Sequence, residues 1–259
     1  MRGEMRRVFR TLGLMAFGVV LGASCGSPPP PPNNSTPLPS PTPIPPTAIK
    51  IDKPINVSFS TYSKDWPVDW QWIDPDEKYH PTPHDVKTGV LRIIVPNEKD
   101  LYGENRTAPR YVKRITGDFQ IETRVKFLPK ENYQGAGLLI YKDENNYMRF
   151  ERAYGGLGGG ADGIRVDVRT LAEYKPLVTP AEISTEAPQV DMKIVRTGRT
   201  FAAYWREDEN AEWRLAAEYQ SDYPETVLAG LIAVNTAREV TAEFAYIHLL
   251  PVKMSESEH

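Results

Sequence analysis

The strongest constraint on the fold of this chain is a series of short segments in which apolar and polar residues alternate. In DFQIETRVKF (residues 118–127), every second side chain from Phe119 to Phe127 falls on one face of an extended strand, and this face is apolar apart from Thr123. Glutamine, glutamate, arginine and lysine fall on the other face. The alternation predicts a strand with one face in a core and the other in solvent or at a functional surface.

Segments of this kind recur along the chain, and residues that favour turns separate them. The other predicted strands are LRIIVP (91–96), APRYVKRI (108–115), GAGLLIYK (135–142), NYMRFERAY (146–154), GIRVDVRT (163–170), DMKIVRTG (191–198), TFAAYWRE (200–207), WRLAAEYQ (213–220), TVLAGLIAVN (226–235) and TAEFAYIHLL (241–250). Hairpin turns are predicted at 143–146, 197–199 and 207–210. Because a single open sheet of this size would leave edges and one face exposed, we predict an all-β fold: a jelly-roll sandwich of two antiparallel sheets.

The N-terminus predicts export. Residues 1–10 contain four arginines and one glutamate, and the apolar run that follows is shorter than the roughly twenty residues of a transmembrane helix. We therefore predict a signal peptide over residues 1–24. Cys25 is the only cysteine and follows small residues, which resembles the cleavage box of bacterial lipoproteins. This predicts lipidation of Cys25 and anchoring to the cell membrane.

One feature departs from that box, because Leu21 lies four residues before Cys25 instead of three. The alternative is ordinary cleavage after Ala23 or Ser24, which would give a secreted protein. Eleven prolines lie between residues 28 and 47, a composition that favours an extended stalk. We predict an anchor and stalk over 25–50, one β-sandwich domain over 51–252 and a polar tail over 253–259.

Charge narrows the choice of partners. Removing the signal peptide takes away four arginines and one glutamate, which leaves 27 basic and 33 acidic side chains. Nucleic-acid binding needs a basic face, so we do not expect a nucleic-acid partner. We expect a monomer whose ligands are neutral molecules or other proteins.

Three runs carry a family resemblance: GDFQIETRV (117–125), YQGAGLLIY (133–141) and DENNYMRF (143–150). They resemble the concanavalin A-like lectin and glucanase superfamily, in particular its lipoprotein domains of unknown function and the C-terminal sandwich of family-43 glycosidases. The resemblance extends from about Phe59 to Leu250. It implies a concave sheet, where relatives bind or cleave sugars.

The resemblance also raises the question of calcium, which some relatives hold near their terminal strands. Where relatives have Asp-Phe-Asp in the last strand, this chain has Glu243 and Ala245 around Phe244. Asp74 and Asp76 form another acidic cluster in a loop, and carboxylate oxygens are the ligands that Ca²⁺ prefers. We predict no cofactor, and leave open a structural calcium site drawn from Asp74, Asp76 and Glu243.

Catalytic motifs are missing from the sequence. Glucanases of this fold place acidic residues at alternate positions on one strand, and no strand here contains Glu-x-Asp-x-Glu. The single cysteine excludes a Cys–His pair within the mature domain. We therefore predict no catalytic residues. The alternative is a glycoside hydrolase whose acid pair comes from Asp143, Glu151 and Asp167.

Aromatic and polar side chains are the candidates for ligand binding. If DWQWID (69–74) is extended, Trp70 and Trp72 share one face, although large aromatics often fill a core instead. Tyr147, Arg149 and Glu151 share a face of the strand that crosses the concave sheet in relatives. We predict a non-catalytic carbohydrate-binding module that uses these five residues. A protein-interaction domain that binds no sugar is a further alternative.

Overall fold

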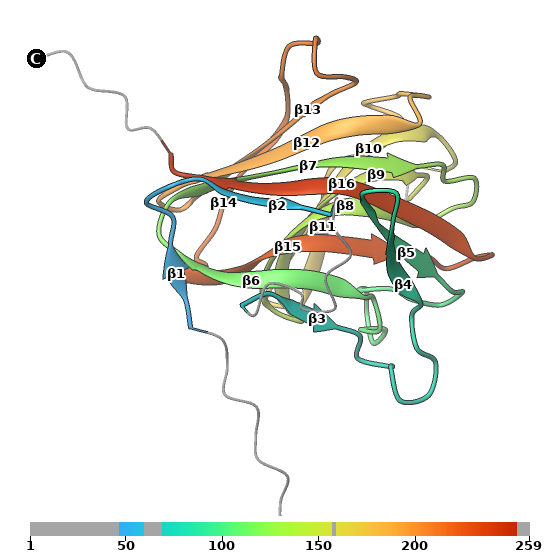
Figure 1. The fold of residues 1–259 in the computed structure, drawn as a ribbon. Helices are drawn as coiled ribbons and strands as arrows, with labels where there is room; N and C mark the ends of the chain where they lie inside the picture. The colour runs from blue at the N-terminus through green and yellow to red at the C-terminus, as the bar shows by residue number, and fades with distance from the viewer. Residues whose placement is uncertain (1–46, 60–68, 157–158, 253–259) are drawn as a thin grey trace, which may run out of the picture. The chain divides into compact units, whose positions relative to one another are not determined.

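A computed structural model describes residues 47–59, 69–156 and 159–252, and these ranges contain strands and no helix. Figure 1 shows two sheets packed face to face. The predicted signal peptide, Cys25, most of the proline-rich stalk and the tail from residue 253 lie outside the described residues. In the described part of the chain, no helix is long and apolar enough to span a membrane.

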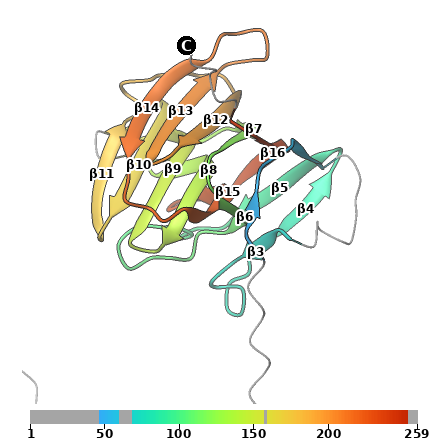
Figure 2. The ribbon, with the colours of Figure 1, turned by 90° about the vertical axis from the view of Figure 1, so that its left-hand side faces the viewer.

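The first sheet, sheet A, runs in the order β1-β6-β15-β8-β9-β10-β11, with β3 also paired to β6. Its strands are β1 (Ile49–Lys50), β3 (Gln71–Ile73), β6 (Arg110–Thr116), β8 (Gln134–Asp143), β9 (Asn146–Tyr154), β10 (Asp162–Thr170), β11 (Glu173–Val178) and β15 (Thr226–Val234). Figure 2 shows β8 to β11 side by side in this sheet.

The second sheet, sheet B, runs in the order β14-β13-β12-β7-β16-β5-β4, with β2 also paired to β16. Its strands are β2 (Ile55–Ser58), β4 (His84–Lys87), β5 (Val90–Val95), β7 (Phe119–Phe127), β12 (Gln189–Thr197), β13 (Thr200–Arg206), β14 (Arg214–Gln220) and β16 (Val240–Leu250). Every pairing is antiparallel except that of β1 with β6.

The structure confirms the predicted all-β sandwich. All eleven predicted strands are present, and the three predicted turns connect β8 to β9, β12 to β13 and β13 to β14. Sequence patterning missed the four strands before β5 and also β11. These strands have two to six residues, and β11 lies at a sheet edge and contains Pro176, which the interior of a sheet does not accommodate.

The main core lies between the two sheets. On β7, the residues from Phe119 to Phe127 alternate between buried and more accessible, so the predicted face of this strand is confirmed as the core face. On β9 and β10 the even-numbered apolar residues, such as Phe150 and Val166, belong to the same core. Burial of one such side chain stabilises the fold by about 1.5–3 kcal/mol.

The outer face of sheet A is also covered over part of its area. Strands β9 and β10 are buried on both faces, unlike β7. A second cluster of buried apolar residues lies here: Leu101, Ala108, Val112, Leu139, Tyr147, Ile232 and Val234. Leu101 and Ala108 belong to the connection between β5 and β6, residues 96–109, so this connection packs over the sheet and forms one wall of the site described below.

Candidate functional site

A cavity of about 440 Å³ lies on the outer face of sheet A. The strands β9, β10 and β11 and three loops contribute its walls. Its lining residues are Asp100, Tyr102, Tyr133, Arg149, Arg165, Asp167, Tyr174 and Thr236. We refer to this cavity as the pocket.

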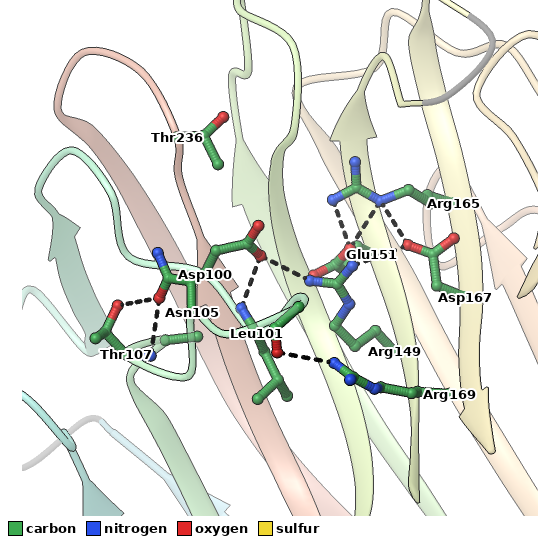
Figure 3. Close-up of polar contacts among 12 residues, drawn as sticks. Asp100, Leu101, Asn105, Thr107, Arg149, Glu151, Arg165, Asp167, Arg169 and Thr236 are labelled. Atoms are coloured by element: carbon green, nitrogen blue, oxygen red, sulfur yellow. Dashed lines mark hydrogen bonds and ion pairs between the residues drawn. The ribbon is translucent and has the colours of Figure 1, made fainter. Parts of the chain in front are cut away.

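Two cross-strand ion pairs lie at and directly beneath the floor of the pocket (Figure 3). Arg165 lies opposite Glu151 in the register of β9 and β10, and Arg149 lies opposite Asp167. Nε and Nη2 of Arg165 donate to Oε2 of Glu151 at 2.9 and 2.7 Å. Nη2 of Arg149 donates to Oδ2 of Asp167 at 3.1 Å, and Nε of Arg165 lies 3.3 Å from the same oxygen. The four side chains therefore form one continuous network.

The covering connection joins this network through Asp100. Its Oδ1 accepts hydrogen bonds from Nη1 of Arg149 at 3.0 Å and from the amide of Leu101 at 2.7 Å, as Figure 3 shows. The Tyr147 hydroxyl donates to the carbonyl of Leu101. Since Arg149 and Tyr147 both come from β9, this strand anchors the connection at two adjacent points.

Burial and charge shift the pKa values of the floor in opposite directions. Burial acts to raise the pKa of Glu151, but attraction to Arg165 and Arg149 outweighs it, so the pKa lies below its ordinary value. Burial also raises the pKa of Asp167, and here the arginines do not reverse the effect. For Arg149, burial favours loss of the proton, but the surrounding carboxylates raise its pKa well above the usual value. Of the two carboxyls, Glu151 is therefore the one that stays ionised to the lower pH.

A glycine on the neighbouring strand makes room for the network. A Cβ added to Gly135 on β8 would lie 2.5 Å from Nη2 of Arg165 and 2.9 Å from the Glu151 carboxyl. These distances are shorter than van der Waals contact, so any larger residue would displace the ion pair. The absence of a side chain at position 135 lets the Arg165–Glu151 pair lie flat against β8.

Three tyrosines form the upper walls of the pocket. Tyr102 and Tyr174 meet edge to face with ring centroids 5.1 Å apart. Tyr102 and Tyr133 are exposed over 46% and 40% of their area, so their rings reach the surface at the pocket mouth. Tyr133 has a positive φ of 67°, a backbone conformation that costs energy for a tyrosine and often occurs at ligand sites.

Asn235 connects the loops that carry these walls. Its buried side chain donates to the carbonyls of Val95 and Pro96 at 3.0 and 3.1 Å, at the start of the 96–109 connection. It also accepts a hydrogen bond from Gln134, which follows Tyr133. The backbone N–H of Asn235 donates to the carbonyl of Lys99 at 2.8 Å. Asn235 therefore links the 96–109 connection and the loop that carries Tyr133 to the loop that contains Asn235 and Thr236.

The structure brings Tyr147, Arg149 and Glu151 together on one face, as predicted, but this face is not wet. Tyr147 and Glu151 are fully buried, and only Arg149 lines the pocket. The reason is the 96–109 connection, which covers the strand and which the local pattern of β9 does not reveal.

The predicted ligand surface of Trp70 and Trp72 needs correction. Trp70 is 7% exposed, belongs to the main core and stacks on Tyr111 with ring centroids 5.0 Å apart. Trp72 is partly buried and stacks on His84 at 4.0 Å. The strand β3 begins only at Gln71, and neither tryptophan lines the pocket. Trp70 is therefore a residue of the main core.

The three candidate calcium ligands do not meet at one place, and each has a basic partner: Asp74 and Asp76 share Lys99, whereas Glu243 lies elsewhere. Oδ1 of Asp74 lies 3.2 Å and Oδ2 of Asp76 lies 3.7 Å from Nζ of the buried Lys99. Glu243 lies on β16 of the other sheet and pairs with Lys126 at 3.0 Å. Within the described ranges, no group of three or more acidic, histidine or cysteine side chains could hold a metal ion.

Of the three carboxylates considered for hydrolysis, two lie together. Glu151 and Asp167 both contact Arg165, whereas Asp143 sits in the β8–β9 turn and accepts hydrogen bonds from Asn145 and Asn146. The pocket residues that the sequence analysis did not select as ligand-binding are Asp100, Tyr102, Tyr133, Arg165, Asp167, Tyr174 and Thr236, of which Asp167 was considered only for hydrolysis. Alternate charges in GIRVDVRT were a usable signal, since they place Arg165 and Asp167 on one face beside the predicted strand β9.

Comparisons with known proteins identify a family and several similar structures. Residues 72–251 match the family model described as "Protein of unknown function (DUF1349)". Comparison with curated proteins gives no match. A functionally unknown protein from Saccharomyces cerevisiae is 13% identical with a TM-score of 0.61, and the match covers 72% of this chain and 98% of the yeast protein.

Two sugar-related structures are similar as well. The GH43 protein BlXynB from Bacillus licheniformis is 19% identical with a TM-score of 0.63; the match covers 76% of this chain but only 39% of BlXynB. Lectin I-B4 from Griffonia simplicifolia, in its metal-free form, is 11% identical with a TM-score of 0.51, covering 77% of this chain and all of the lectin. At these identities the likeness concerns the fold, and it confirms the predicted concanavalin A-like sandwich.

Proposed function

The chain belongs to the family described as "Protein of unknown function (DUF1349)", and we propose that within it this protein is a non-catalytic module that binds carbohydrate in the pocket. The observation that carries this proposal is the combination of three tyrosine rings above a floor of paired charges. Sugar rings present C–H faces that stack on aromatic rings, and their hydroxyl groups pair with polar side chains. The similar folds of a lectin and a GH43 protein support the same class of ligand.

We favour binding without catalysis because of the burial and contacts of Glu151. This side chain is fully buried, holds both contacts to Arg165 through one oxygen and is not among the residues that line the pocket. A catalytic carboxylate must reach the substrate, within hydrogen-bond distance of the reacting atom.

One observation favours a glycoside hydrolase as the second candidate. Glu151 and Asp167 are neighbouring carboxyls with pKa values shifted in opposite directions, which is the pattern of an acid and base pair. Release of reducing ends from polysaccharides by the wild-type protein, with loss of release in Asp167→Asn, would establish hydrolysis in place of simple binding.

The binding test uses the full chain, purified in detergent, on an array of soluble and insoluble polysaccharides. We expect retention on one class of glycan and at least tenfold weaker retention for Tyr102→Ala, which removes an aromatic wall. Tyr79→Ala is the matched control, because Tyr79 is 70% exposed and does not line the pocket. Equal retention of both variants would contradict the pocket, and complete absence of retention would favour a protein-interaction role.

The same array, run with calcium and with a chelator, tests the metal question. Since the described residues contain no cluster of metal ligands, we expect the same retention in both conditions. Loss of retention with the chelator would show that calcium is needed for binding after all.

We further propose that the module is exported and held at the cell membrane by a lipid on Cys25. The charged and apolar N-terminus, the small residues before Cys25 and the proline-rich stalk support this. In a bacterial host, the wild-type chain should incorporate a fatty-acid label and stay with the membrane fraction. Cys25→Ser should lose both properties and Ser27→Ala should keep them; unlabelled wild-type protein in the medium would favour secretion.

A further inference from the structure

The pocket offers a ligand no excess of positive charge. The charged residues that line it are two arginines and two aspartates, and Glu151 lies directly beneath with one more negative charge. The guanidinium of Arg149 holds Asp100 and Asp167, and that of Arg165 holds Glu151. Both cations are therefore already neutralised, and an anionic ligand would meet the negative charge of the surrounding carboxylates.

The groups left for a ligand suit hydroxyls. Asp100 uses Oδ1 for both of its hydrogen bonds, which leaves Oδ2 as an acceptor at the pocket wall. The hydroxyls of Tyr102 and Tyr133 can either donate or accept, and the hydroxyl of Thr236, which donates to the carbonyl of Asn132, can still accept. Burial, followed by the negative charge of Asp167 and a hydrogen bond to it, raises the pKa of Tyr174, so this hydroxyl keeps its proton and shares it with Asp167. This set matches an uncharged polyol.

The size of the pocket limits how much of a chain can enter. A volume of about 440 Å³ lies toward the lower end of the roughly 300–1,000 Å³ that small-molecule sites occupy. The 96–109 connection, the loop that carries Tyr133, the loop that carries Thr236 and the edge strand β11 all contribute walls. Such a pocket admits the end of a sugar chain, whereas a groove along the sheet would admit its middle.

We propose that the pocket receives one or two terminal, uncharged sugar residues of a glycan and discriminates against uronic acids. This inference rests on the proposed carbohydrate-binding function and names the substrate class of the same site. Asp100 and Glu151 supply the discrimination, because a sugar carboxylate placed near them meets like charge.

A competition assay tests the proposal on the full chain, bound to the polysaccharide that retains it on the array. The competitors are free galactose and glucose with their charged counterparts galacturonic and glucuronic acid, together with mannose, xylose and arabinose. At least one neutral monosaccharide, or its disaccharide, should release the protein. Its uronic acid counterpart should need at least a tenfold higher concentration.

A pair of variants assigns the discrimination to the pocket. Asp100→Asn removes one negative charge at nearly constant shape and should reduce the preference for the neutral sugar at least threefold. Asp85→Asn, at an exposed residue of β4 outside the pocket, should keep the wild-type preference. Thermal unfolding shows whether both variants fold. If Asp100→Asn does not fold, the competition between neutral and charged sugars on the wild-type protein is the test.

The outcomes distinguish recognition of terminal neutral sugars from carbohydrate binding in general. Release by neutral monosaccharides or disaccharides, with weaker release by uronic acids, supports terminal neutral recognition. Release only by longer oligosaccharides, or preferential release by uronic acids, overturns this inference and leaves carbohydrate binding intact. Failure to bind any glycan on the array overturns the proposed function itself.

Discussion

The two outer faces of the sandwich use the same kind of cross-strand ion pair in different surroundings. On sheet A, Arg165 and Glu151 are 4% and 0% exposed, because a connection between strands packs over them. On sheet B, Lys126 and Glu243 form a pair of similar length at 3.0 Å, but they are 53% and 29% exposed. The covering layer makes the Arg165–Glu151 pair part of a fixed, buried polar site, whereas the Lys126–Glu243 pair, which has no such layer over it, remains solvated.

The difference matters for energy as well as geometry. Exposed ion pairs contribute about 0–1 kcal/mol, because water screens the charges and the side chains lose entropy on pairing. A buried pair costs desolvation to form, but removing one partner leaves an uncompensated charge and costs about 3–5 kcal/mol. The same substitution on the two faces should therefore have very different consequences.

The largest expected effect comes from Arg165→Leu, which leaves Glu151 and Asp167 buried beside one remaining arginine. We expect the free energy of unfolding to fall by about 3–5 kcal/mol. Lys126→Leu, on the exposed pair of sheet B, should lower it by no more than about 1 kcal/mol. Urea unfolding at pH 7 measures both. Similar losses for the two variants would contradict the distinction between the faces.

A smaller loss is expected for Asn235→Ala, which tests whether the loops around the pocket depend on one side chain. The substitution leaves the carbonyls of Val95 and Pro96 without a buried donor, so we expect a loss of about 1–3 kcal/mol. Asn56→Ala, at an exposed residue of β2, is the control and should change stability by less than about 0.5 kcal/mol. Glycan retention should fall for Asn235→Ala even where the protein remains folded. Full retention would show that the loops hold their positions without it.

The sandwich was predictable from local patterns, because alternation along a strand directly reports which face is buried. The face of β7 and the hairpin turns followed from residues within a few positions of one another. The five missed strands show the limit of this signal: two to six residues, or a strand with a proline at an edge, carry too little alternation to be recognised.

The pocket was less predictable because its walls come from segments far apart in the chain. Arg149 could be placed on the correct face from β9 alone, but its partner Asp100 comes from a connection whose packing depends on the whole fold. The tryptophans misled for a related reason, since the same aromatic ring can stack on a sugar or on Tyr111 in the core. Only the tertiary structure distinguishes these surroundings.

Gly135→Ala perturbs the buried pair without removing either charge. The added methyl group would overlap the Arg165–Glu151 pair, so we expect a loss of about 1–3 kcal/mol. Combined with Arg165→Leu, the loss from Gly135→Ala should shrink, because the guanidinium that the methyl group meets is gone. A double-mutant cycle by urea unfolding measures this coupling, and strict additivity would show that the backbone at position 135 matters instead.

The smallest expected effect lies on sheet B, at Tyr246, whose ring stacks on His248 with centroids 4.2 Å apart. Burial, followed by the charge of Asp191, raises the pKa of Tyr246 from 10.0 to about 12. As the pH rises the unfolded chain loses this proton first, so the contribution of Tyr246 is complete below about pH 10 and is lost as the pH approaches 12. Tyr246→Phe should therefore leave stability at pH 8 nearly unchanged and make its decline above pH 10 shallower by at most about 1.4 kcal/mol per pH unit. Urea unfolding at pH 8 and 11 measures this slope. Glycan retention should not change, because Tyr246 lies on the sheet opposite the pocket, and an altered retention would mean that the two faces are coupled through the core.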